Sequence, residues 1–113
     1  MIIDLNKKYI TLYKYEVRLF NIINDEVFGA ANFLGNDVWL PLSWNVFDGS
    51  VVEHVPNFDL TYESNLPLIL AQESGELIQE KLIGNNDDMW VDTLTPDWSL
   101  THEYRIKPKE TIQ

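Results

Sequence analysis

The side chains best suited to binding chemistry in this sequence are its tryptophans and its few basic residues. The 113-residue chain has four tryptophans and only 8 lysines and arginines. Trp44 and Trp98 stand near turn-rich stretches, where an aromatic ring often caps a pocket or anchors an interface. A planar base can stack on such a ring while an arginine pairs with its phosphate. For the other two, Trp39 and Trp90, core packing is the simpler interpretation.

Three basic residues, Arg18, Arg105 and Lys107, are candidates to pair with the phosphate of a ligand stacked on such a ring. Arg105 and Lys107 alternate with Tyr104 and Ile106, so in a strand both basic groups share one face. The predicted ligand site comprises Trp44, Trp98, Arg18, Tyr104, Arg105 and Lys107. The alternative is simple surface pairing of the basic groups with the carboxylates Asp92, Asp97 and Glu103, which is the more common arrangement.

Catalytic and metal-ligating patterns are not found in the sequence. The two histidines, His54 and His102, lie far apart and neither has the spacing of a metal-binding motif. No serine occupies a Gly-x-Ser-x-Gly elbow, and no Gly-rich phosphate loop is present. Asp87 and Asp88 resemble paired carboxylates, but a turn explains them better. We therefore expect no enzyme activity, no metal and no cofactor.

The composition is strongly acidic. Asp and Glu total 18 against 8 basic residues, which gives a net charge of −10. Such a field repels duplex DNA and anionic membranes and attracts basic surfaces, although solubility alone is the simpler role, because net charge bears on solubility before partners. The chain contains no cysteine, no apolar run of membrane-spanning length and no recognisable signal peptide. We expect a cytosolic protein that binds neither DNA nor membrane.

Alternating β-branched and aromatic residues predict a mainly β, β-rich α+β fold of antiparallel meanders in one compact domain, 1–113. Turn signals occur at Asn24-Asp25 and Asp48-Gly49, and Gly29 allows a bulge. The expected strands cover 9–23 as a pair meeting near 14–16, then 26–34, 38–40 up to Pro41, 57–62, 76–83, 89–94 and 102–107. One short helix over 66–72, with Pro67 in its first turn, follows a linker at 63–65.

The two halves of the chain, 1–62 and 66–108, echo each other. Each contains a Gly-Asn turn, an acidic residue, an apolar residue and a tryptophan, which is Trp39 in the first half and Trp90 in the second. A second tryptophan then follows a Pro-containing loop, at Trp44 and Trp98. This pattern indicates either a duplicated β unit or a coincidence between two turn-rich segments.

The final third of the chain resembles small accessory proteins of tailed phages. Their typical ending is a Gly-x-x-apolar arm, a Trp-turn-Trp segment and Tyr-Arg-Ile-Lys-Pro, which match 75–78, 90–98 and 104–108 here. The resemblance covers 66–108, and Glu76 departs from it because a lysine is common there. The first half resembles a companion phage module through Trp44, Asp48-Gly49 and Asp59-Leu60.

The resemblance implies a phage-encoded protein of the host cytoplasm that acts stoichiometrically in counter-defence. Such proteins sequester a nucleotide-derived immune signal, usually as homo-oligomers, and exposed edge strands are compatible with oligomer formation. The alternatives are an acidic inhibitor of a host defence nuclease or complex, of the anti-CRISPR or DNA-mimic type, and an accessory protein without a defence role. The scattered carboxylates weaken the DNA-mimic alternative.

Overall fold

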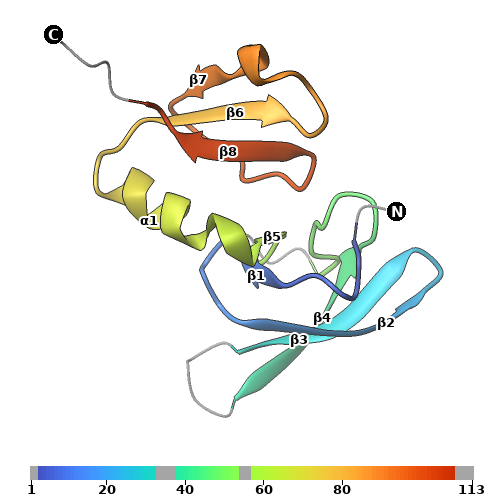
Figure 1. The fold of residues 1–113 in the computed structure, drawn as a ribbon. Coiled ribbons are helices and arrows are strands. Elements are labelled where there is room, and N and C mark those ends of the chain that lie inside the picture. The colour runs from blue at the N-terminus through green and yellow to red at the C-terminus, as the bar shows by residue number, and fades with distance from the viewer. Residues whose placement is uncertain (1–2, 33–37, 54–56, 109–113) are drawn as a thin grey trace, which may run out of the picture.

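The computed structural model describes residues 3–32, 38–53 and 57–108. Within these ranges the chain forms small antiparallel sheets and one short α-helix, which confirms the predicted β-rich α+β class. Figure 1 shows a three-stranded sheet at each end of the molecule, with the helix and a two-stranded ladder between them.

The first sheet is a meander of β2 (Val17–Ile23), β3 (Glu26–Asn32) and β4 (Trp39–Asn45). Asn24 and Asp25 connect β2 to β3 with φ angles of 50° and 67°. Two successive positive φ angles define the tight hairpin turn whose twist matches that of the paired strands. The turn predicted at these two residues is therefore confirmed.

The predicted irregularity at Gly29 is also confirmed. The β2–β3 register shifts between Leu19 and Asn21, opposite Gly29. A Cβ atom at Gly29 would lie 2.2 Å from the carbonyl oxygen of Arg18, so only glycine allows the two backbones to approach this closely.

The expectation that Pro41 ends a strand is wrong, because β4 continues through it to Asn45. Pro41 lies opposite Ala30 on β3. The backbone groups of Ser43 and Asn45 face away from β3 and bond to Val52 and Ser50. Pro41, Ser43 and Asn45 are alternate residues of the strand, so their backbone groups point to the same side. The missing N–H of Pro41 therefore falls on the side of β4 that faces away from β3, where proline is tolerated.

The predicted strand pair over 9–23 is present, but the two strands belong to different sheets. β1 (Tyr9–Thr11) pairs with β5 (Leu60–Tyr62), not with β2. Lys14, with φ of 69°, turns the chain between β1 and β2. The pairing of β1 with β5 joins segments about fifty residues apart, which a local sequence pattern does not specify.

The expected helix is confirmed as α1 (Leu66–Glu73), with proline in its first turn. The expected linker before it is instead a 3₁₀ turn, η1 (Glu63–Asn65), that continues directly into α1. Asn65 is buried and its Nδ2 donates to Thr61 Oγ1 at 3.1 Å. Asn65 thus anchors this turn in the interior, whereas Glu63 and Ser64 are exposed.

The second three-stranded sheet has the order β7-β6-β8. Its strands are β6 (Ile78–Leu82), β7 (Val91–Thr93) and β8 (His102–Ile106), and the 3₁₀ turn η2 (Asp87–Met89) precedes β7. β6 therefore occupies the centre, with an antiparallel partner on each side.

Two apolar clusters hold these elements together. The larger one packs the β2-β3-β4 sheet against β1 and β5, and the smaller one packs α1 against β6 and β8. Each cluster includes a residue from the other half of the chain, Leu100 in the first and Ile10 in the second. A buried bond from Thr61 Oγ1 to the carbonyl oxygen of Trp98, 2.7 Å long, links the halves further.

Candidate functional site

The two tryptophans predicted to contact a ligand are core residues in the structure. Trp44 is 0% exposed, lies within β4, and donates its Nε1 to the carbonyl oxygen of Phe58 at 2.8 Å. Trp98 is buried, with its ring centroid 4.7 Å from that of Tyr104. Neither ring has an open face for a ligand, so the assignment of Trp44 and Trp98 to a surface site is corrected.

The other two tryptophans are half-buried, and each carries a basic group over its ring. The guanidinium carbon of Arg18 lies 4.6 Å from the ring centroid of Trp39. That of Arg105 lies 4.4 Å from the centroid of Trp90, with Lys81 Nζ at 5.4 Å from the same ring. Arg18 and Arg105 therefore stack on Trp39 and Trp90, not beside the predicted Trp44 and Trp98.

The two arginine–tryptophan pairs occupy matching positions in their sheets. Arg18 lies opposite Ala30 on the central strand β3, and Trp39 lies opposite Asn32, two residues further on. Arg105 lies opposite Gln79 on the central strand β6. Val91 pairs with Glu80, so Trp90 approaches Lys81, again two residues further on. The strand that carries the arginine differs in chain order between the two sheets: β2 comes before the central strand β3, whereas β8 comes after both β6 and β7. The duplication of the two halves therefore stays a prediction.

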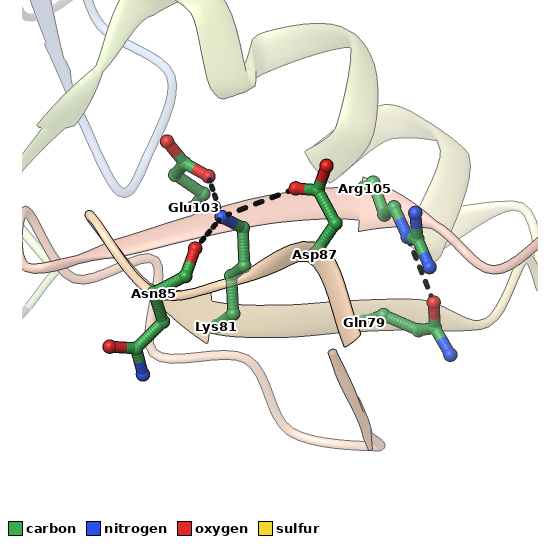
Figure 2. Close-up of polar contacts among 6 residues, drawn as sticks. All are labelled: Gln79, Lys81, Asn85, Asp87, Glu103 and Arg105. Carbon is green, nitrogen blue, oxygen red and sulfur yellow. Dashed lines mark hydrogen bonds and ion pairs between the residues drawn. The ribbon is translucent and has the colours of Figure 1, made fainter. Parts of the chain in front are cut away.

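Charged and polar side chains form a ladder on one face of the second sheet (Figure 2). Lys81 is 7% exposed, and its Nζ donates to the carbonyl oxygen of Asn85 at 2.7 Å. The same Nζ lies 3.1 Å from Glu103 and 3.6 Å from Asp87. A buried ammonium group requires such partners, because desolvation without them is costly.

The ladder continues through Gln79, which is also buried. Arg105 donates its Nε to Gln79 Oε1 at 2.9 Å, and Gln79 Nε2 donates to Asp92 at 2.9 Å. Lys107 closes the row with an ion pair to Asp92 at 2.9 Å. The hydrogen bonds from Gln79 and Lys107 lower the pKa of the Asp92 carboxyl. Lys107 thus pairs with a surface carboxylate, which was the alternative to a role in ligand binding.

A pocket of about 410 Å³ lies between β8 and the η1–α1 segment. Ser64, Asn65 and Leu68 line one side of it, and His102, Glu103, Tyr104 and Arg105 line the other, together with Trp90. Small-molecule sites typically occupy roughly 300–1,000 Å³. Of the six predicted ligand residues, the structure brings Tyr104 and Arg105 into this pocket and places the other four outside its lining.

The pocket combines aromatic surface with one cationic group. Arg105 is oriented by Gln79 and Trp90, and among the described residues its terminal nitrogens have no hydrogen-bond partner. The Glu103 carboxylate is partly neutralised by Lys81. His102 contacts Thr101 Oγ1 through Nδ1, which leaves its Nε2 for other partners. A planar ring with one anionic group matches these features.

Tyr104 is a neutral member of the pocket lining. Burial raises the pKa of its phenol to about 12, although a hydrogen bond from the Ser99 amide opposes the rise. The phenol therefore stays protonated at physiological pH and contributes a neutral aromatic surface.

Sequence reasoning missed Trp90 and Gln79 as the contacts of Arg105, and it missed Lys81, whose Nζ also lies over the Trp90 ring. Their alternation in the sequence was a usable signal, because Gln79 and Lys81 must share one face of a strand. The strand register that places Arg105 opposite Gln79 is a tertiary property, which alternation within one strand does not specify.

The remaining expectations concern metals and membranes. His102 lines the pocket, whereas His54 lies outside the described residues. In the described ranges, no group of three or more histidine or carboxylate side chains could hold a metal ion. No helix of the described chain is both long and apolar enough to cross a membrane.

Comparisons with known proteins leave the function to be argued from this geometry. No protein-family model matches the chain, and no curated protein or solved structure matches it. What the fold and the pocket define is a β-rich α+β domain with one arginine–tryptophan pair at the edge of a pocket.

Proposed function

We propose that the protein is a non-enzymatic binding protein that captures a nucleotide-like small molecule in the pocket between β8 and the η1–α1 segment. The observation that carries the proposal is Arg105, held against Trp90 at 4.4 Å beside a pocket of about 410 Å³. The resemblance to phage accessory proteins makes the proposed ligand a nucleotide-derived immune signal, bound stoichiometrically in the host cytoplasm.

The residues that line the pocket differ in chemistry, and each kind is proposed to contact a different part of the ligand. Arg105 pairs with a phosphate through its terminal nitrogens, and the aromatic side chains of Tyr62, Trp90 and Tyr104 contact the base or sugar. The net charge of −10 opposes an anionic ligand at long range. Affinity must therefore come from short-range contacts to Arg105.

The test begins with the small molecules carried by the purified protein. The protein is produced in cells with active cyclic-nucleotide or ADP-ribose signalling, then denatured, and the released molecules are identified by mass spectrometry. We expect a nucleotide in stoichiometric amount. We expect Arg105→Gln and Trp90→Leu to lower its occupancy about tenfold or more, as loss of a charge-assisted bond or a stacking contact does.

Lys107→Gln provides the matched control, because Lys107 lies on the same face as Arg105 but pairs with Asp92 outside the pocket. Its occupancy should equal that of the parent. Full occupancy in Arg105→Gln would contradict the site assignment. A parent that carries no nucleotide and binds neither cyclic dinucleotides nor ADP-ribose in calorimetry would contradict the function itself.

A further inference from the structure

The outer face of the β2-β3-β4 sheet carries exposed large apolar side chains among polar ones. Val27 and Trp44 point into the core, so the residues that alternate with them face outward. Ile23 is 51% exposed, Phe28 is 38% exposed, and Phe20 at the bulge is 65% exposed. No described helix or strand covers this face (Figure 1). Clusters of exposed large apolar side chains on small proteins commonly mark interaction sites.

The second sheet provides an internal comparison. At the positions of its central strand that match Ala30 and Asn32 of β3, β6 has Gln79 and Lys81, which anchor the polar ladder. On the outer face of the second sheet, the lysines of that ladder are therefore paired with carboxylates. The first sheet has an arginine–tryptophan pair too, but Ala30 and Asn32 lie opposite it in place of a charged ladder, and exposed apolar residues follow further along the sheet at Phe28 and Ile23.

The border of this apolar face is acidic. Glu16 precedes β2, Asp25 occupies the β2–β3 turn and Glu26 begins β3. Glu53 lies along the edge of β4, where its carboxylate accepts bonds from the Ser43 backbone and hydroxyl. The basic residue of the face is Arg18, stacked on Trp39. Four carboxylates along the border of the face, against one guanidinium on it, favour a partner of opposite charge.

We infer that this face is the docking surface for another protein whose contact region has an apolar centre and a lysine- or arginine-rich rim. Phe28 and the Arg18–Trp39 pair are the expected anchors, because aromatic and arginine side chains dominate interface energetics. A second copy of this chain is a poor occupant, because it would bring two acidic rims together in a protein of net charge −10.

The test compares the parent with Phe28→Ser and Ile23→Ser, both at exposed positions that the core does not require. Proteins captured from host cells by the parent but not by Phe28→Ser are identified, purified and titrated individually by calorimetry. We expect one-to-one binding that weakens about tenfold or more in each variant. Binding should also weaken as salt rises, because the acidic rim is screened. Val91→Ser, at an exposed valine of the other sheet, is the control and should bind like the parent.

Several outcomes would overturn the inference. If no captured protein depends on Phe28 and Ile23, the face is not a docking surface. Salt-independent binding, or a partner with an acidic contact region, would remove the charge argument. Sedimentation of the parent and Phe28→Ser tests the remaining occupant: a parent dimer that this substitution dissociates would make the face an interface between two copies. Circular dichroism of each variant excludes unfolding as the cause.

Discussion

Arg105 donates its Nε to Gln79 and lays its guanidinium group 4.4 Å from the centroid of Trp90. These two contacts restrict the side chain before any ligand arrives, so less conformational entropy is lost on binding. Lys107, two residues further along, has its ammonium group engaged by Asp92 instead. Neighbouring basic residues on one face therefore have different capacities to bind an anion.

Tyr104 makes the stability of the protein sensitive to alkaline pH. Its folded-state pKa of about 12 exceeds the ordinary value of 10.0, and burial also raises the pKa of Tyr9 and Tyr62. A raised folded-state pKa gives stability that is complete below the unfolded pKa and is lost as the pH rises toward the folded one. We expect the free energy of unfolding to fall between about pH 10 and pH 12.

Urea unfolding at a series of alkaline pH values measures this loss, and Tyr104→Phe provides the comparison. The variant should be less stable at neutral pH by about 1 kcal/mol, because it lacks the phenol oxygen that accepts from Ser99. Above about pH 10 its stability should fall less steeply than that of the parent. Equal slopes would show that Tyr104 does not contribute to the alkaline transition.

At the level of elements, the two three-stranded sheets share an arrangement but differ in what covers their outer faces. Ion pairs among β6, β7, β8, η2 and their flanking residues lie on one, and exposed apolar side chains such as Phe28 and Ile23 lie on the other. The close approach of β2 and β3 at Gly29 lies in the β2-β3-β4 sheet, whose outer face carries the exposed apolar side chains. Because a bulge increases local twist, it also makes the edge strand β2 a poorer template for strand addition.

Gly29→Ala tests the role of that close approach. The new Cβ would meet the carbonyl oxygen of Arg18 at 2.2 Å, so the hairpin must shift to accommodate it. We expect a loss of about 1–3 kcal/mol in the free energy of unfolding, the usual cost of overpacking. Gly75→Ala, where no atom lies within 4 Å of the new Cβ, should cost less and reflect only its positive φ of 102°. Equal losses in the two variants would argue against steric closure at Gly29.

Across the whole molecule, 18 acidic and 8 basic residues act on a fold with two separate apolar clusters in its described residues. Excess negative charge destabilises the compact state by self-repulsion, and dissolved salt screens that repulsion. Most of the described ion pairs are at least partly exposed, so they contribute little to the free energy of unfolding. Screening them with salt therefore removes little stability. The net electrostatic balance should therefore oppose folding.

We expect the melting temperature, followed by circular dichroism, to rise as sodium chloride increases from about 0.02 to about 0.3 M. The variant Asp25→Asn/Glu26→Gln changes the net charge from −10 to −8 and should show a smaller rise. A melting temperature that falls with salt would mean that ion pairs such as Lys14–Glu73 outweigh the general repulsion.

Local chemistry determined much of this protein from its sequence alone. The Asn24-Asp25 turn, the glycine bulge and the proline-initiated helix were predictable, because each depends on backbone preferences within a few residues. The β-rich class followed from residue alternation, which is also a short-range property.

Only the tertiary structure decided which side chains are buried and which meet. The pairing of β1 with β5 and the continuation of β4 through Pro41 depend on contacts between distant segments. For the same reason Trp44 and Trp98 are core residues and Trp90 lies at the pocket, although the turn-rich sequence around Trp44 and Trp98 favoured a surface position for both. Burial is set by which face of a strand meets the rest of the chain, and a one-residue change in register reverses that face.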